Sequence, residues 1–377
     1  RRSLASGVQA ESRYSLAADH TLRSGVIVTG ERSTSKTTSL VLPAPSCGGG
    51  TLGGNGICTI SDDGAKTGWT YSVYLQDEWH ATPSLTLNYG GRFDVVDTIT
   101  HENQLSPRIN AVWQATPATT VHAGYANYFS PPPFELFTVN SFNKFTGTSA
   151  APEVTSSSPV KAERDHYFDV GASQKVLDGL TVGIDAYYKY SRNLIDIGQF
   201  GAPIIFTPFN YHMGRNLGVE LTTSYTSGNL TFYGNLALAY QKAKGIASAQ
   251  SNFNAEELAF LDTHTFQTDH SQIMTASGGV AYLWRGTRLS ADMLAGSGLR
   301  ADSAGVHNGR SLPSWEQVNL GVSRRFDLPK AGAIEARLDL INIFDEVYKI
   351  RDGTGVSVGA PQFGPRRAVF AGLRKEF

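Results

Sequence analysis

Residues 368–377, AVFAGLRKEF, alternate between apolar and polar side chains and stop on an aromatic residue. Successive side chains of a strand point to opposite faces. One face of this segment therefore carries Val369, Leu373 and Phe377, and the other carries Arg374 and Glu376. A strand that separates lipid from a wet interior in a transmembrane barrel has this pattern. An edge strand of a soluble sandwich is the alternative, so the rest of the chain has to decide between them.

The same alternation returns along most of the chain. Between Leu180 and Ser191, apolar residues at even positions alternate with mainly polar ones at odd positions, and the segments that start at Leu85, Leu230 and Leu289 behave in the same way. The pattern predicts an all-β protein with about fifteen antiparallel strands. Their ranges are 2–17, 21–33, 67–80, 84–98, 104–116, 119–130, 164–176, 180–193, 213–227, 229–243, 270–284, 287–298, 314–327, 332–345 and 365–377.

Short turns and long connections alternate between these strands. Short, turn-forming segments such as Asp178-Gly179 and Arg285-Gly286 join one pair of strands, and the next pair is joined by a much longer polar segment. The long connections are expected at 34–66, 131–163, 194–212, 244–269, 299–313 and 346–364. Transmembrane barrels have this asymmetry, with tight periplasmic turns and long extracellular loops.

Strand length and composition agree with a membrane barrel. Runs of about 10 to 14 residues are longer than ordinary globular strands and match a tilted bilayer crossing. Charged residues make up 17% of the chain, against roughly 25% in a typical soluble domain. The net charge is −1, which gives no overall attraction to nucleic acid. Uninterrupted apolar runs of the length of a membrane helix, about 18 residues, do not occur.

The two cysteines, Cys47 and Cys58, flank a glycine-rich segment. A disulfide between them is expected, and in the entropic model it would stabilise so short a loop by about 3 kcal/mol. Two free thiols in a flexible loop are the alternative. The pair lacks the further ligands that a zinc site needs.

Several segments resemble TonB-dependent receptors, in the order in which that family has them. They are 74–79 (YLQDEW), 85–94 (LTLNYGGRFD), 106–108 (SPR), 125–132 (YANYFSPP), 342–348 (NIFDEVY) and the terminal strand that ends in Phe377. The resemblance implies a 22-stranded outer-membrane barrel around a plug that contacts TonB. Residues 1–377 would then be a partial barrel domain that supplies the last fifteen strands, with seven strands and the plug upstream.

The resemblance also implies partners. They are outer-membrane lipid of a Gram-negative bacterium, the TonB complex through the plug, and the barrel-assembly machinery through the terminal strand. Lys375 departs from the family pattern, which has an apolar residue two before the terminal aromatic. We expect that this segment alone does not form a stable channel, because open sheet edges in a bilayer leave backbone groups unpaired.

Ligand capture by such a receptor uses aromatic and polar side chains of the long loops. The candidates for ligand binding are Phe134, Phe137, Phe209, Tyr211, Arg351, Gln362, Phe363 and Arg366. For the aromatic residues the alternative is packing within the loops, and for Arg366 it is pairing with an acidic side chain.

One polar cluster, Asp262, His264, Asp269 and His270, raises the question of a metal. Its spacing fits no regular zinc pattern, so a solvated loop is the prediction and no metal site is assigned. The chain has no nucleophile elbow and no phosphate-binding glycine loop. We therefore expect no enzyme activity and no cofactor.

The leading hypothesis is import of a scarce, bulky nutrient with energy from TonB. Ferric siderophores, corrinoids and oligosaccharides are equally compatible with the sequence. Three alternatives remain open, namely a passive porin, an outer-membrane enzyme with its site on the extracellular rim, and a secreted adhesive β protein. The adhesive protein would pack its apolar faces into a dry core.

Overall fold

The computed structural model describes residues 2–136, 141–200, 205–328, 332–356 and 358–375. One antiparallel sheet of 18 strands dominates this part of the chain. Fifteen of the strands are the main ones: β1 (Arg2–Ser15), β2 (His20–Val41), β4 (Cys58–Thr82), β5 (Leu85–Asp97), β6 (His101–Thr116), β7 (Thr119–Ser130), β8 (Glu163–Leu177), β9 (Leu180–Arg192), β11 (Ile205–Ser227), β12 (Leu230–Ser248), β14 (Met274–Trp284), β15 (Thr287–Gly296), β18 (Trp315–Leu328), β19 (Gly332–Ile341) and β22 (Ala368–Lys375).

The remaining elements are short and lie in the connections between main strands. They are β3 (Thr51–Leu52), β10 (Ile195–Phe200), β13 (Thr265–Gln267), the hairpins β16 (Arg300–Ser303) with β17 (Val306–Ser311) and β20 (Lys349–Asp352) with β21 (Pro361–Phe363), the 3-10 turns η1 (Phe134–Leu136), η2 (Ser141–Phe145) and η3 (Gln250–Asn252), and helix α1 (Ala255–Thr263). Among the described residues, no helix is both long and apolar enough to span a membrane.

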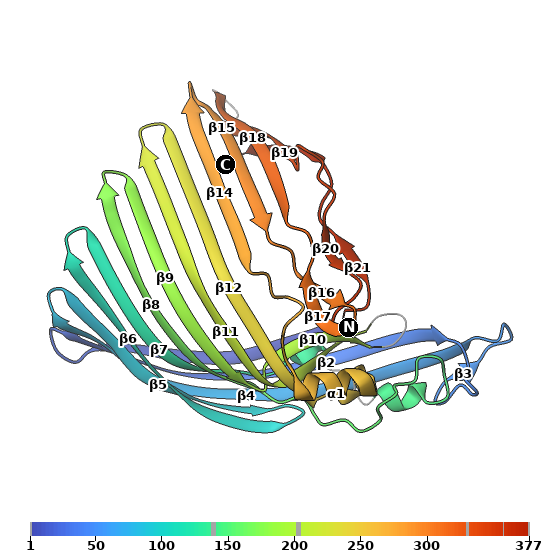
Figure 1. Ribbon diagram of the computed structural model, residues 1–377. Coiled ribbons are helices and arrows are strands. Elements are labelled where there is room, and N and C mark those ends of the chain that lie inside the picture. The colour runs from blue at the N-terminus through green and yellow to red at the C-terminus, as the bar shows by residue number, and fades with distance from the viewer. Residues whose placement is uncertain (1, 137–140, 201–204, 329–331, 357, 376–377) are drawn as a thin grey trace.

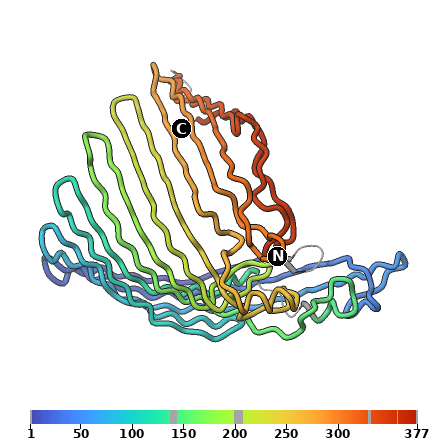
Figure 2. The backbone as a smooth tube through the Cα atoms, viewed as in Figure 1, coloured from blue at the N-terminus to red at the C-terminus, as the bar shows by residue number. Residues whose placement is uncertain are grey.

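The main strands form a meander in which each strand pairs antiparallel with the next, from β1–β2 to β19–β22. In the described residues β1 and β22 do not pair with each other, and the sheet curves into an open trough (Figures 1 and 2). The all-β fold and the antiparallel meander predicted from the alternation are confirmed. The fifteen main strands correspond to the fifteen predicted ranges.

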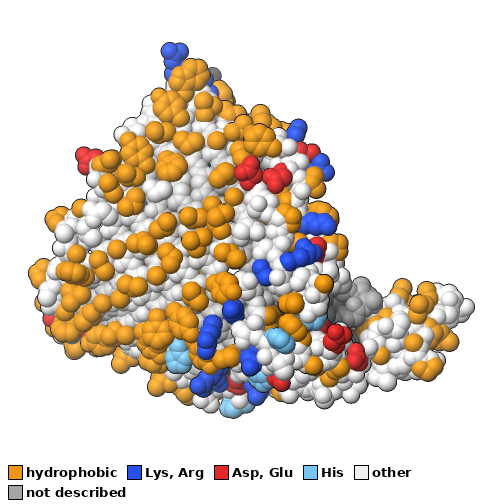
Figure 3. All heavy atoms as spheres, in the orientation of Figure 1, with side chains coloured by type: hydrophobic (Ala, Val, Ile, Leu, Met, Phe, Trp, Pro, Cys, Tyr) orange, Lys and Arg blue, Asp and Glu red, His pale blue; other side chains and the backbone are white. Residues whose placement is uncertain are grey.

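The pairing register aligns the apolar residues of neighbouring strands on one face. Ile184 pairs with Leu221, and Leu221 with Leu236. On the opposite face Thr222 pairs with Gly183 and with Asn235. Because the side-chain period of a strand is two, this register continues across the sheet. Figure 3 shows the resulting rows of hydrophobic side chains across the strands, with charged groups concentrated toward the loop end.

The apolar face is exposed rather than covered by a second layer. Leu221 is 44% exposed and Leu373 is 81% exposed. The two clusters of buried hydrophobic residues lie instead among the long connections at one end of the sheet. A dry core between strand faces, which an adhesive β protein would need, is not seen in the described residues.

The prediction of a long connection at 34–66 is wrong. The structure extends β2 and β4 far into this segment, with pairs from Thr34 with Ala65 to Val41 with Cys58. The segment is polar on both faces, so it lacks the alternation by which strands were predicted. Its strand structure rests on backbone hydrogen bonds, which do not require one face to meet lipid.

Candidate ligand-binding site at the loop end

The long connections gather at one end of the trough, where α1, the hairpins β16–β17 and β20–β21, and the ends of β10, β11 and β12 meet (Figure 1). We call this assembly the loop platform. The first residues of β11, 205–210, pair with the short strand β10 and belong to it, while β11 pairs with the long strand β9 only from Met213 onward. The part of β11 that pairs with both neighbouring long strands therefore begins near Met213.

Helix α1 is fixed at its start by a capping box. The Asn254 side chain accepts a hydrogen bond of 2.7 Å from the backbone N–H of Glu257, and the Glu257 carboxylate accepts one of 3.3 Å from the backbone N–H of Asn254. These bonds satisfy donors that a helix start otherwise leaves unpaired. Leu261 of α1 is fully buried in the larger hydrophobic cluster, so the helix covers the platform.

Aromatic rings form the centre of that cluster. Phe209 lies edge-on to Tyr211 and Phe253, at centroid distances of 4.9 and 5.0 Å, and Tyr211 lies edge-on to Phe266 at 5.6 Å. Phe209 and Tyr211 are 0% exposed. The structure thus places these two ligand-binding candidates in the platform core, where a ligand cannot reach their rings. Packing within the loops, the alternative from the sequence, describes their position.

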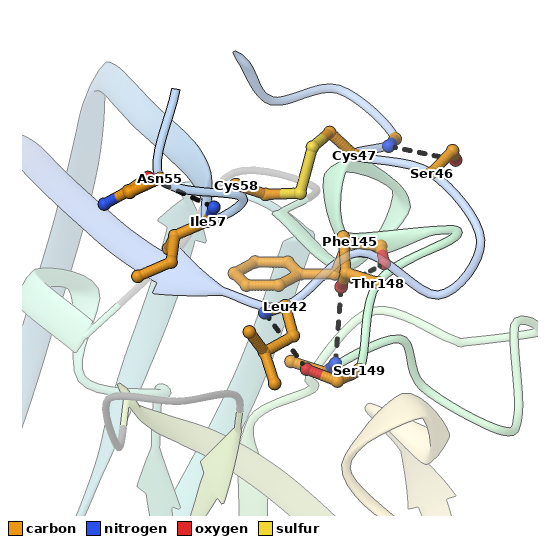
Figure 4. Close-up of a disulfide and its surroundings, with 11 residues drawn as sticks. Leu42, Ser46, Cys47, Asn55, Ile57, Cys58, Phe145, Thr148 and Ser149 are labelled. Atoms are coloured by element: carbon orange, nitrogen blue, oxygen red, sulfur yellow. Dashed lines mark hydrogen bonds between the residues drawn. A yellow bond between two sulfur atoms is a disulfide. The ribbon is translucent and has the colours of Figure 1, made fainter. Parts of the chain in front are cut away.

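A second hydrophobic cluster surrounds the disulfide. The Sγ atoms of Cys47 and Cys58 are joined by a bond of 2.04 Å, and Phe145 packs against Cys58 with only 1% of its surface exposed. Figure 4 shows the Phe145 ring beside the disulfide, with Thr148 donating a hydrogen bond of 2.7 Å to the Phe145 carbonyl. The disulfide therefore closes the connection between β2 and β4, and the packing of Phe145 joins this hairpin tip to the connection between β7 and β8.

Loss of this disulfide should loosen the hairpin tip but not the sheet. We expect the double variant Cys47→Ser/Cys58→Ser to lose about 3 kcal/mol of local stability. The sheet should remain intact, because β2 and β4 are paired by backbone hydrogen bonds up to Val41 and Cys58. Limited proteolysis should show faster cleavage within residues 48–57, with unchanged heat-modifiable migration. Wild-type protein treated with a thiol reductant is the control. Equal protease resistance with and without the disulfide would contradict the expectation.

The other ligand-binding candidates differ in position. Phe134 is 7% exposed in η1, and Phe137 lies outside the described residues. Gln362 and Phe363 are exposed on β21. The Arg366 Nε donates a hydrogen bond of 2.8 Å to Asp345, which also receives one from the terminal nitrogen of Arg366. These bonds hold the pKa of the Asp345 carboxyl well below its usual range.

Arg351 belongs to a charged cluster within the platform. Its Nη1 lies 3.0 Å from Asp269 Oδ2, and its Nη2 donates a hydrogen bond to Nε2 of His270. The other ring nitrogen of His270, Nδ1, lies 2.7 Å from Asp269 Oδ1 and 3.5 Å from Asp196 Oδ1. Asp196 comes from β10, Asp269 and His270 follow β13, and Arg351 comes from β20. Three connections, far apart in sequence, meet here.

Burial dominates the electrostatics of this cluster. It raises the pKa of Asp196 to about 6, and the nearby negative charge of Asp269 acts in the same direction. The hydrogen bond to Asp269 raises the pKa of His270. The Asp269 side chain is 4% exposed and that of His270 is 48% exposed, so the cluster is buried on one side and reaches solvent on the other.

The cluster differs from the one considered in the sequence. His264 stacks on Phe260 with a centroid distance of 4.3 Å and ends α1. Within the described residues, the group whose ligand atoms could hold an ion consists of Asp196, Asp269 and His270. Sequence reasoning missed Asp196, because it lies in an unremarkable Ile-Asp-Ile run more than 70 positions away.

Asn308 links three of the long connections through hydrogen bonds. Its side chain donates to the Gln267 carbonyl at 3.0 Å and accepts from the Val356 backbone N–H at 3.0 Å. Its own backbone N–H donates to Asp302 at 2.7 Å, and its φ of 52° lies in the left-handed region, which asparagine tolerates. The β16–β17 hairpin is thereby joined to β13 and to the β20–β21 hairpin.

The polar face of the sheet also carries paired charges. Ser72 donates a hydrogen bond of 2.5 Å to Asp94, and the Arg92 Nε donates one of 2.7 Å to the same carboxylate. Further along, the His122 Nε2 lies 3.0 Å from Asp185. Polar groups so arranged suit a face in contact with water.

Comparison with known proteins identifies the fold. Residues 6–343 match the family model described as TonB dependent receptor-like, beta-barrel. The chain belongs to the TonB-dependent receptor family. The resemblance found in the sequence is thereby confirmed. TonB-dependent receptors are outer-membrane proteins of Gram-negative bacteria, and the family implies ligand binding and interaction with TonB. No curated protein matches the chain.

Solved structures agree with the family. The iron transporter FrpB from Neisseria meningitidis aligns with a TM-score of 0.64 and 14% identity over 98% of this chain and 54% of its own. A mutant of the ferric enterobactin receptor PfeA from Pseudomonas aeruginosa aligns with a TM-score of 0.64 and 18% identity, over 100% of this chain and 54% of its own. FpvA from P. aeruginosa, bound to a heterologous pyoverdine, aligns with a TM-score of 0.65 and 13% identity, over 100% of this chain and 48% of its own.

These identities establish a shared fold rather than a shared ligand. This chain spans about half the length of the structures that it matches.

Proposed function

We propose that this chain is part of an outer-membrane receptor that imports a scarce, bulky nutrient with energy from TonB. The observation that carries the proposal is the loop platform. Its aromatic core and charged cluster, together with the disulfide at the tip of the β2–β4 hairpin, order the long connections at one end of a sheet whose apolar face suits lipid. Binding sites need such preorganised groups, because ordering flexible loops on binding lowers affinity.

We also propose that the chain forms part of a larger closed barrel. In the described residues β1 and β22 each pair with one neighbour. Unpaired strand edges cost several kcal/mol per backbone group in lipid, so further strands would be needed to close the sheet. The proposed partners are outer-membrane lipid, the TonB complex and, through the carboxy-terminal segment that includes β22, the assembly machinery.

Ferric siderophores are the ligand class to test first, followed by corrinoids and oligosaccharides. The printed names of the solved relatives include an iron transporter and a ferric enterobactin receptor. Within the platform, the exposed Gln362 and Phe363 are the proposed ligand contacts, since a ligand can reach both. Binding and transport need no reactive constellation, and no catalytic role is proposed.

Uptake should depend on TonB. In cells that produce the protein, accumulation of a labelled ferric siderophore is expected to fall to background when TonB is deleted or a protonophore is added, because release of a tightly bound ligand requires energy. A porin with a similar exterior serves as control and should be unaffected by either treatment. Uptake that persists without TonB would support the passive-channel alternative instead.

A further inference from the structure

The face that carries the apolar rows continues toward the loop platform with an aromatic row. Tyr188 of β9 pairs with Leu217 of β11, and Leu217 pairs with Tyr240 of β12. Girdles of aromatic residues flank the apolar band of a transmembrane barrel at both interfaces. Since the long connections lie at this end of the sheet (Figure 1), the aromatic row corresponds to the extracellular interface.

Basic side chains occupy the next two rows on the same face. Two positions beyond the aromatic row, Arg215 of β11 pairs with Lys242 of β12. In the row after that, Met213 pairs with Arg192 of β9 and with Lys244 of β12. We call Arg192, Arg215, Lys242 and Lys244 the basic patch. Figure 3 shows basic side chains between the hydrophobic rows and the loop end.

The basic patch has no counter-charge within the described part of the chain. Arg192, Arg215 and Lys244 make no ion pair there, and the Lys242 ammonium lies over the Tyr240 ring at 5.0 Å. Like charges that lie directly opposite each other on paired strands are destabilising, and Arg215 and Lys242 are such a pair. Because strands lie about 4.8 Å apart, the patch on three strands is only about 10 Å wide.

The polar face treats facing like charges differently. Asp185 and Glu220 also lie opposite each other, but the His122 Nε2 lies 3.0 Å from the Asp185 carboxylate. The whole chain has 32 basic and 33 acidic residues, so an excess of cations in the composition does not explain the basic patch. Its repulsion therefore calls for an anion from outside the chain.

We propose that the basic patch binds a glycolipid of the outer leaflet whose headgroup carries two phosphates. The inference rests on the proposed placement of the apolar face in the outer membrane. The acyl chains of the lipid lie along the aromatic and aliphatic rows, and the phosphates lie over the basic patch. Arginine and lysine suit this position, because their stems pack on apolar surface while their charged ends reach the polar layer.

The charges of the patch select the headgroup. Guanidinium groups bind phosphate oxygens through two parallel hydrogen bonds, and an anion shared by Arg215 and Lys242 replaces their repulsion with attraction. Four cations within about 10 Å match a headgroup with two phosphates better than one with a single phosphate. The basic patch thus anchors the wall of the receptor at the level where the loop platform begins, whichever nutrient is imported.

Lipid binding by the receptor purified from outer membranes in detergent tests the site. Native mass spectrometry compares lipid A with two phosphates, dephosphorylated lipid A and phosphatidylglycerol. We expect wild type to bind the first lipid at least about tenfold more tightly than the other two. Equal binding of lipid A with and without phosphates would refute the patch as a phosphate site. Equal binding of phosphatidylglycerol would overturn the assignment to a glycolipid.

Substitutions assign the binding to these side chains. Arg192→Gln/Arg215→Gln should weaken binding of phosphorylated lipid A about tenfold and leave the dephosphorylated lipid unaffected. Arg108→Gln/Lys175→Gln is the matched control, since both residues are exposed and lie on the polar face. Heat-modifiable migration confirms that each variant is folded. Equal binding by the patch variant and the control would overturn the proposal.

A single substitution separates repulsion from lipid binding. In vesicles of zwitterionic lipid alone, Arg215→Gln should unfold at a higher urea concentration than wild type, because the repulsion from Lys242 is removed. In vesicles that contain phosphorylated lipid A the order should reverse, because the variant has lost a phosphate contact. The same order in both kinds of vesicle would contradict the proposal.

These results are distinguishable from those of the uptake test. Patch-dependent lipid binding together with uptake that persists without TonB would keep the lipid site and reject energy-coupled import. TonB-dependent uptake together with lipid binding that ignores the patch would have the opposite meaning.

Discussion

Leu221→Arg should destabilise the barrel by about 2 to 4 kcal/mol, the range for arginine at the lipid-facing midplane of a transmembrane barrel. Leu221 lies between Ile184 and Leu236 on the apolar face, so the new guanidinium would be placed in hydrocarbon. Urea unfolding in lipid vesicles measures the change. Poor assembly, seen as loss of heat-modifiable migration from cell envelopes, is the expected cellular counterpart.

The neighbouring residue provides the matched control. Thr222 lies on the opposite face between Gly183 and Asn235. On that same polar face the acidic residues Asp185 and Glu220 lie opposite each other in the strand register. Arginine is therefore tolerated there, and Thr222→Arg should change stability by no more than about 0.5 kcal/mol. Equal losses from Leu221→Arg and Thr222→Arg would contradict the assignment of the two faces to lipid and water.

Phe209→Ala should unfold the loop platform while the membrane strands persist. Truncation of a buried phenylalanine costs about 3 to 5 kcal/mol, and Phe209 is fully buried between Tyr211 and Phe253. Hydrogen exchange should accelerate in α1, β10 and β13 more than in the long strands. Ligand uptake should be lost as well, because the connections that present the binding surface are no longer ordered.

The exposed Phe363 separates platform stability from ligand contact. Its side chain is 55% exposed, so Phe363→Ala should leave hydrogen exchange of the platform unchanged. If Phe363 contacts the ligand as proposed, this variant weakens ligand binding alone. Unchanged exchange in Phe209→Ala would show that the aromatic cluster does not hold the platform together.

Strand prediction succeeded where one face of a strand meets lipid. The alternation from Leu180 to Ser191 predicted a strand at 180–193, and β9 covers Leu180–Arg192. It failed in the outer half of the β2–β4 hairpin, where both faces are polar and the ladder reaches Val41 and Cys58. In that segment burial still alternates, but several residues of the buried face are small and polar, such as Ser35 and Ser39, so the alternation of apolar and polar residues is lost.

Site prediction had a different limit. The sequence assigned the aromatic and arginine candidates to long connections, but their environments could not be read from sequence. Phe209 and Tyr211 pack inward, whereas Phe363 is exposed. Composition marks which residues are capable of ligand contact, and packing decides which ones remain accessible.

The sequence by itself determined the antiparallel meander, its apolar and polar faces and the family, because these follow from local alternation and from the order of short segments along the chain. Only the tertiary structure decided that Asp196, Asp269, His270 and Arg351 meet. Their side chains come from three connections, and contact between them depends on how the curved sheet brings its strand ends together. The local periodicity of the sequence does not specify which strand ends come together.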